Sequence, residues 1–348
     1  SLARNHGDEP LIQARILRTI EDLPRAWELA REAGEAVDRH YWAEFEIFGR
    51  GEFELVNEAA AQLRRHGRFA RALDLLAIYS HRSEVTLDSR LIVDLLNDLI
   101  DAEDPERGTL SQYDIAALLE YARNSGEIDT EVLGLLEWRY LPALDSSSSI
   151  PALQSLLASS PEFFVQIISY LYRRKGAESN DEKHPENLVR NAWTLLHRWE
   201  VVPGSTDRGG EVNEALLLEW VSTARRLLSE AGRLSVGEAH IGQVLAHSKA
   251  DEEYWPTLPV RNLIENDSSE TIDRNFMIGI ANSRGIVSRG IGEGGEQERA
   301  LAEKYEEYPA LINDEWPRTA RLLRTVAEEY RREAAEQDED RKSTRLNS

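Results

Sequence analysis

The sequence predicts an all-α fold: an irregular helical-repeat, α-solenoid-like array followed by a C-terminal helical module. Apolar residues recur at three- and four-residue steps along most of the chain, which is the period of one helix face. Runs that alternate apolar and polar residues between turn signals, as half-buried strands do, are missing from the sequence. A chain of 348 residues built from short helices is also too long for one bundle core, so the helices should stack as an array.

The first helices are marked by spacing and by proline. Leu11, Ala14, Leu17 and Ile20 recur at three-residue steps, and Pro24 is suited to the first turn of a second helix. Similar apolar periods predict helices over 56–63, 69–79, 91–99, 115–121, 132–141 and 163–172.

Polar residues mark helix starts and loops. Thr86 is the expected N-cap before Leu87, and Ser111 with Asp114 resembles a capping pair before Ile115. Three polar or glycine-containing stretches predict loops, at 145–149, 176–185 and 203–211.

The segment Gly67-Arg68-Phe69-Ala70-Arg71-Ala72-Leu73 resembles the hairpin of a tetratricopeptide repeat. The resemblance covers about one repeat, residues 56–79, and implies that Phe69 and Ala72 pack between two helices. Tyr79 and Glu84 stand where that family has a small residue and a closing proline. A weaker echo begins at Gly232, and no fixed period links the two segments. Tetratricopeptide-like and HEAT-like geometries therefore both stay open.

The predicted organisation is a helical-repeat array over 1–250 and a C-terminal module over 255–341. That module contains a Gly-rich loop at 282–295, and its last helix, from Pro317 to about Asp340, should pair with the helix at 300–308. Residues 342–348 resemble a translated sequencing-adapter tail, which we expect to be non-native. The missing initial Met and the excess of Arg over Lys favour a fragment of a larger bacterial protein.

Charge and composition narrow the range of partners. Asp and Glu number 63 against 41 Lys and Arg, which gives a net charge of -22 that repels a phosphate backbone. We therefore expect no nucleic-acid partner. No apolar run approaches the roughly 18 residues that span a bilayer, so no membrane partner is expected. The chain has no Cys, which excludes disulfides and thiolate sites and favours a cytoplasmic location.

Candidate catalytic chemistry is sparse. Residues 290–295 satisfy the pattern G-x-G-x-x-G, but no strand of adequate length precedes them, and Glu293 opposes a phosphate. His240 and His247 share a face of one predicted helix at a spacing too long for a pair of metal ligands, which favours structural imidazoles. We expect no catalytic residue, cofactor or metal.

Charged side chains at the C-terminal end are the candidate binding residues. Arg284 and Arg289 lie on one side of the centre of the Gly-rich loop, and Glu293 and Glu296 lie on the other. These four residues are expected to form an interhelix latch or to bind a partner through charge-assisted hydrogen bonds. Arg318, Arg321 and Arg324 lie on the last helix, and a second basic cluster lies at 64–71. Either cluster suits an acidic partner or forms a solvated face. Most of the eight Trp are expected in the core, with one or two exposed for binding.

These features favour a protein–protein interaction scaffold that binds one or more protein partners. The sequence leaves two alternatives open. One is a sensor or regulatory arm whose catalytic domain lies upstream, and the other is a divergent enzyme that uses the Gly-rich loop.

Overall fold

The computed structural model of the chain describes residues 9–45, 53–102, 104, 108, 110–144, 148–174, 176, 183–206, 210–251, 254–267, 269–284 and 295–346. Within these ranges it contains 17 α-helices and no strand, and 73% of the chain is helical. The two antiparallel bridges, between Ser205 and Val212 and between Asp251 and Tyr254, are isolated pairs. The all-α prediction is confirmed.

The helices divide into two compact units, residues 1–150 and 151–348. The helices of unit 1 are α1 (Glu9–Leu17), α2 (Leu23–Glu32), α3 (Glu35–Ala43), α4 (Val56–Arg65), α5 (Phe69–Ser80), α6 (Ser89–Asp101), α7 (Gln112–Ser125) and α8 (Thr130–Tyr140), with a short 3-10 turn at Phe53–Leu55. Those of unit 2 are α9 (Pro151–Ser159), α10 (Pro161–Leu171), α11 (Glu186–His197), α12 (Glu214–Glu230), α13 (Leu234–Leu245), α14 (Leu258–Asn266), α15 (Glu270–Asn282), α16 (Glu296–Ile312) and α17 (Pro317–Leu346).

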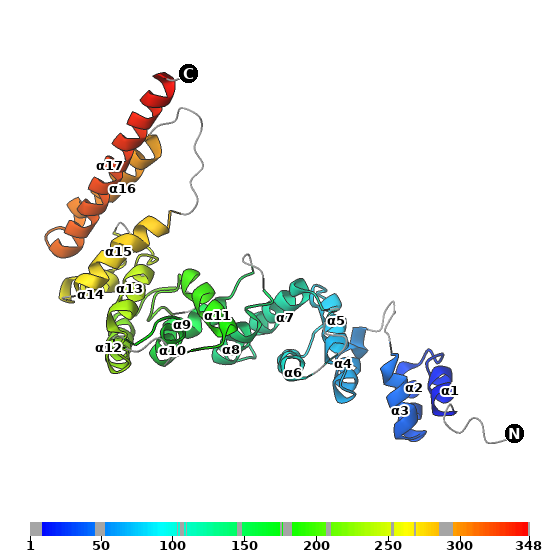
Figure 1. Cartoon of the computed structure of the whole chain (residues 1–348). Coiled ribbons are helices and arrows are strands. Elements are labelled where there is room, and N and C mark those ends of the chain that lie inside the picture. Colours follow the sequence, from blue (N-terminus) through cyan, green and yellow to red (C-terminus); the bar gives the residue numbers. More distant parts are fainter. Residues whose placement is uncertain are drawn as a thin grey trace. The chain divides into compact units, whose positions relative to one another are not determined.

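Within each unit most helix contacts join neighbours in chain order or a helix and the helix after next (Figure 1). In unit 1, α5 contacts α4, α6 and α7, and α6 contacts α8. In unit 2, α12 contacts α10, α13 and α14, and α13 contacts α15. This pattern is typical of stacked helical arrays, in which each element buries its apolar face against near neighbours.

Side-chain caps explain where several helices begin. The capping box predicted at Ser111 and Asp114 is present, with each side chain bonded to the other residue's backbone N–H. The prediction for Thr86 is wrong, because Asp88 is the N-cap of α6 and its carboxylate accepts the N–H groups of Arg90 and Leu91. The carbonyl of Thr86 accepts instead from the side chain of Asn57.

Two hairpins, α4–α5 and α12–α13, share one turn geometry. Gly67 and Gly232 adopt φ of 73° and 68°, the left-handed region that glycine enters without steric cost. The N–H of Arg68 donates to the carbonyl of Leu63 at 2.9 Å, and the N–H of Arg233 donates to that of Leu228 at 2.8 Å. The echo noted at Gly232 therefore has the same local structure as the segment at Gly67.

Of the two residues expected to pack inside the α4–α5 hairpin, one is fully buried and the other is partly buried. Ala72 is fully buried on α5, as predicted. Phe69 is only partly buried, because it is the first residue of α5 and lies at the edge of the interface. The tight contact of the hairpin is therefore at the small residue.

We predict that Ala72→Arg destabilises the chain far more than Phe69→Ala. A long charged side chain at a fully buried site brings both overpacking and desolvation, costing on the order of 3 kcal/mol or more. The partly buried ring should cost about 1 to 2 kcal/mol. Urea denaturation of both variants measures the difference, and equal stability of Ala72→Arg and the parent would contradict the hairpin packing.

The boundary predicted near residue 250 differs from the contact division, which falls between Ile150 and Pro151. Helices on both sides of residue 250 pack together, α12 with α14 and α13 with α15. Between these helices, Asp251 and Tyr254 exchange backbone hydrogen bonds of 2.9 Å. The Asp251 carboxylate also accepts from the N–H of Leu258 and pairs with Arg261. Neither α14 nor α15 is marked by the sequence analysis.

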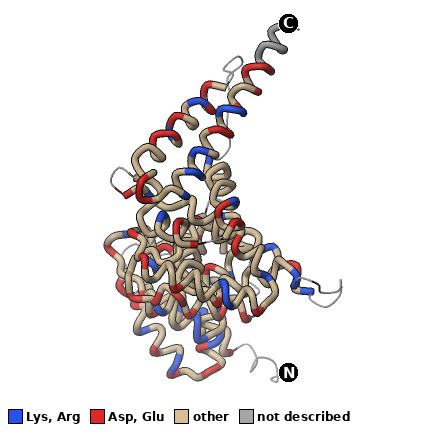
Figure 2. The backbone as a smooth tube through the Cα atoms, turned by 90° about the vertical axis from the view of Figure 1, so that its left-hand side faces the viewer, with Lys and Arg blue, Asp and Glu red and all other residues tan. Residues whose placement is uncertain are grey.

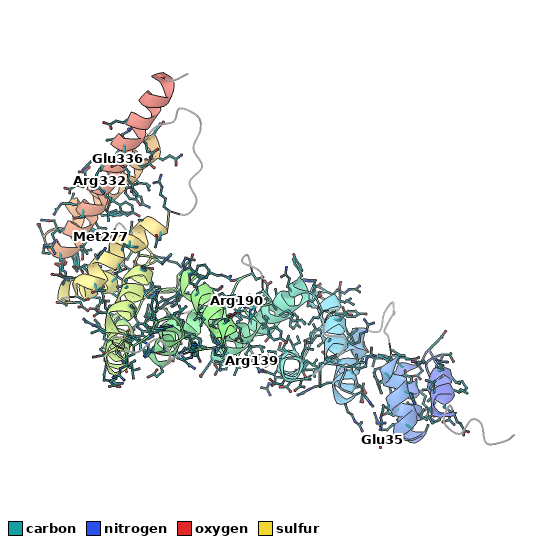
Figure 3. The ribbon with its side chains drawn as sticks, viewed as in Figure 1. Glu35, Arg139, Arg190, Met277, Arg332 and Glu336 are labelled. Atoms are coloured by element: carbon teal, nitrogen blue, oxygen red, sulfur yellow. The ribbon has the colours of Figure 1, made fainter. Side chains whose placement is uncertain are left out.

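The last two helices form the antiparallel pair expected from the sequence. The rings of Tyr305 and Tyr330 stack with centroids 5.9 Å apart, and Arg331 of α17 pairs with Glu306 of α16. Arg332 and Glu336 project from the other side of α17 (Figure 3). This helix continues to Leu346 and so includes part of the segment 342–348. The non-native origin of that segment stays a prediction.

Helices α13 and α15 approach unusually closely through two glycines. A Cβ atom added to Gly242 would lie 2.5 Å from the carbonyl oxygen of Ile272, and one added to Gly279 would lie 2.5 Å from that of Gln243. Both are clashes with backbone, which a rotamer change cannot relieve. The separation of these helices therefore requires glycine at both positions.

We predict that Gly279→Ala lowers the free energy of unfolding by at least about 2 kcal/mol, since the clash exceeds the roughly 1 kcal/mol gained in helix propensity. Ala281→Ser, on the exposed side of the same helix, should change it by less than about 0.5 kcal/mol. Denaturant unfolding of the two variants measures both values. A neutral or stabilising Gly279→Ala would show that the helices are farther apart.

Candidate functional site: a histidine pocket in unit 2

The residues predicted around the Gly-rich loop are only partly within the described chain. Arg289 and Glu293 lie outside it. Arg284 pairs with Glu298, whose side chain is fully buried, and lies 3.8 Å from Glu333. Glu296 is the first residue of α16 and is exposed. The structure therefore places Arg284 in contacts between α15 and the α16–α17 pair, as a latch requires, and its partners there are Glu298 and Glu333.

The end of the G-x-G-x-x-G pattern has a packing role. Gly295 precedes α16, and its N–H donates to the carboxylate of Asp338 at 3.0 Å. A Cβ at Gly295 would meet the backbone of Ala334. A carboxylate of the same chain thus occupies the position at this helix N-terminus where a bound phosphate would accept hydrogen bonds.

The three arginines of α17 have different surroundings. Arg318 is partly buried and pairs with Asp273 at 2.8 Å, and its N–H donates to Glu265. Arg321 is exposed, and Arg324 is exposed and donates to Asn313 at 2.7 Å. Only the last two lie at the surface.

The basic cluster at 64–71 is likewise engaged within unit 1. Arg64 pairs with Asp94 and Asp98, and Arg71 pairs with Asp74. Lys and Arg are interspersed with Asp and Glu along much of the described chain (Figure 2). This arrangement agrees with the solvated-face interpretation of the cluster.

A pocket in unit 2 brings together side chains that the sequence analysis did not connect. We call it the histidine pocket, and six aromatic or imidazole side chains define it: Tyr172, Trp193, His197, Trp199, His240 and His247. They come from the end of α10, from α11 and the residues after it, and from α13 and the residues after it. The cavity has a volume of about 530 Å³, within the range of small-ligand sites.

Helical spacing positions most of these groups. Trp193 and His197 are four residues apart on α11, so they share a face, and their rings stack with centroids 4.2 Å apart at 26°. His240, Gln243 and His247 follow the same face of α13 and its extension. Trp193 stays 54% exposed although its ring orientation is fixed by the stack.

Tyr172 is held by the α12–α13 turn. The buried side chain of Arg233 donates from Nε to the carbonyl oxygen of Tyr172 at 2.6 Å. The Tyr172 hydroxyl in turn lies 3.0 Å from Nε2 of His240. The turn glycine Gly232, which places Arg233, therefore also determines where the Tyr172–His240 pair lies.

Burial keeps the inner imidazoles of the pocket in their neutral form. Burial lowers the pKa of His240 to about 4, and the neighbouring His197 contributes in the same direction. Burial also lowers the pKa of His247, partly opposed by Glu200, and raises the pKa of Tyr172. Among the described residues, the side chains that line the pocket include no Lys, Arg, Asp or Glu. Such a site offers stacking faces and neutral hydrogen-bonding groups.

Of the six groups, the sequence marks His240 and His247 and favours a structural role for both. It anticipated one or two exposed Trp, and Trp193 is exposed, but it did not identify Trp193, Tyr172, His197 or Trp199 as site residues. The Trp-x-x-x-His spacing on α11 was an available signal. Among the described residues, no group of three or more His, Asp or Glu has an arrangement able to hold a metal ion.

Comparisons with protein-family models, curated proteins and solved structures returned no match to this chain. Among the described residues, no helix combines the length and the apolar character needed to cross a bilayer.

We predict that the parent chain loses more stability on acidification than His240→Gln does. Between pH 6.5 and about 4 the unfolded imidazole is protonated while the folded one is neutral, so unfolding takes up a proton and stability falls as pH falls. At about pH 5 this proton uptake lowers the free energy of unfolding by on the order of 2 kcal/mol relative to neutral pH. His197, His247 and Tyr172 surround His240 in both proteins, so the comparison isolates its titration.

The measurement is thermal melting of both proteins between about pH 7.5 and about pH 5, with exposed His81→Gln as the matched control. Parallel pH profiles for the parent and His240→Gln would contradict a buried neutral imidazole at this position.

Proposed function

We propose that the chain is a protein–protein interaction module and that the histidine pocket is its recognition site in unit 2. Stacked helices present extended surfaces on which recognition depends on side chains rather than on bond-making chemistry.

The exposed ring of Trp193 is the main support for this proposal. Exposed apolar side chains are common on protein surfaces, but Trp193 is a large ring that stacks on His197 at the edge of an open cavity. A stacked ring has less conformational entropy to lose when a partner covers it. Trp is also enriched among the residues that dominate binding energy at interfaces.

Charge supports a protein partner over a nucleic acid. The net charge of -22 repels phosphate backbones at long range. Within the basic cluster at 64–71, Arg64 and Arg71 pair with neighbouring carboxylates, which reduces the attraction they would exert on an anion. Exposed Arg321 and Arg324 offer a secondary contact for acidic groups of a partner.

Selection from a random peptide library displayed on phage tests this proposal. We expect immobilised parent protein to enrich peptides that bind about tenfold more weakly to Trp193→Ala, since loss of a central aromatic contact typically costs at least this much. The matched control is Tyr113→Ala, which removes an aromatic ring that is 77% exposed in unit 1 and should leave binding unchanged.

Fluorescence anisotropy with labelled peptides gives the affinities. A selection that enriches no peptide, or peptides that bind Trp193→Ala as tightly as the parent, would contradict the proposed function.

A further inference from the structure

The histidine pocket also has features that select among ligand classes. This step rests on the proposed function, because it assumes that the pocket binds a side chain of a partner. The chemistry of the lining decides which kind of side chain fits.

A charged ligand gains little binding free energy in this pocket. Among the described residues, no Lys, Arg, Asp or Glu lines it, so an entering ammonium, guanidinium, carboxylate or phosphate would lose hydration without meeting the opposite charge of such a side chain. Protonation of the imidazoles would supply a counter-charge for anions, but burial disfavours the protonated form of His240 and His247. The lining therefore favours an uncharged ligand.

The walls favour a flat ligand. Trp193 lies against His197 with a small interplanar angle, and its exposed surface is available to a second ring. Trp199 and Tyr172 form further aromatic walls. Offset or edge-to-face contacts between rings stabilise binding beyond simple area burial, which an aliphatic side chain cannot reproduce.

The interior also favours a ligand with a polar edge. Beside the rings lie the Tyr172–His240 pair and two side-chain amides, Gln243 and Asn282. The Gln243 amide is oriented by a 3.3 Å bond to Asn275. A phenol or an indole can stack and also place one hydrogen-bonding group among these neutral donors and acceptors.

We propose that the histidine pocket binds the uncharged aromatic side chain of a partner peptide, a tyrosine or a tryptophan, between the Trp193 ring and the Tyr172–His240 pair. The pocket volume of about 530 Å³ accommodates one such side chain with part of its backbone. Phosphorylation of a bound tyrosine would place a dianion in this neutral site and prevent binding.

Nuclear magnetic resonance of the full chain with labelled histidine tests this proposal with four probes: the N-acetyl amides of tyrosine, tryptophan, leucine and arginine. We expect the tyrosine and tryptophan probes at millimolar concentration to shift the imidazole signals of His197 and His240 saturably. The leucine and arginine probes should leave them unchanged, and so should the N-acetyl amide of phosphotyrosine. Signals are assigned from His197→Gln and His240→Gln.

Trp193 variants link the shifts to the pocket. Trp193→Ala should lower the affinity for the tyrosine and tryptophan probes about tenfold. Trp193→Phe keeps a stacking ring and should retain most of the affinity of the parent. Tyr113→Ala should behave like the parent. Because Trp193 is exposed, its loss should leave the melting temperature nearly unchanged, which separates a binding effect from misfolding.

Several results would overturn the inference: tighter binding of the arginine or phosphotyrosine probe, equal shifts from the leucine probe, or no shift with any aromatic probe. If none of the aromatic probes binds while Trp193-dependent peptides are still enriched from the library, this inference fails and the proposed function stands. If they bind but no peptide is enriched, the proposed function fails and the aromatic selectivity of the pocket stands.

Discussion

The buried guanidinium of Arg233 is the contact on which the histidine pocket depends. It donates to the carbonyl of Tyr172 at the end of α10 and to that of Ala231 in the α12–α13 turn. Burying this charge costs solvation energy, which hydrogen bonds to backbone oxygens offset. Arg68 does the same in unit 1, donating to the carbonyls of Trp42 and Phe45. In both hairpins the residue after the turn glycine joins its helix pair to an earlier helix.

Much of this fold follows from the sequence because helices are local. The periods at 56–63 and 69–79, the capping pair Ser111–Asp114 and the turn at Gly67 each need only a few consecutive residues to be recognised. The wrong prediction of the N-cap of α6 also concerns local interactions. Asp88 competes with Thr86 for the start of α6, and an aspartate two residues later is the better acceptor for the first free N–H groups.

The pocket could not be derived in this way. Periodicity places Trp193 and His197 on one face of α11, but it does not indicate which other helix that face meets. The contacts that position the other pocket helices are tertiary: Arg233 joins the α12–α13 turn to Tyr172, and Gly242 and Gly279 allow the close approach of α13 and α15. The lowered pKa of His240 follows from burial by these tertiary contacts. The sequence alone therefore favours a structural role for this imidazole.

The packing of each helix on near neighbours has a consequence for how the chain acquires its structure. The extensive helix contacts join helices no more than three positions apart in chain order, the widest being α10 with α13 and α14 with α17. Contacts so local in sequence require little loop-closure entropy, and they are associated with rapid folding. In an array of this kind folding can start at any hairpin and spread to its neighbours, so helices near the N-terminus can pack before synthesis of the chain is finished.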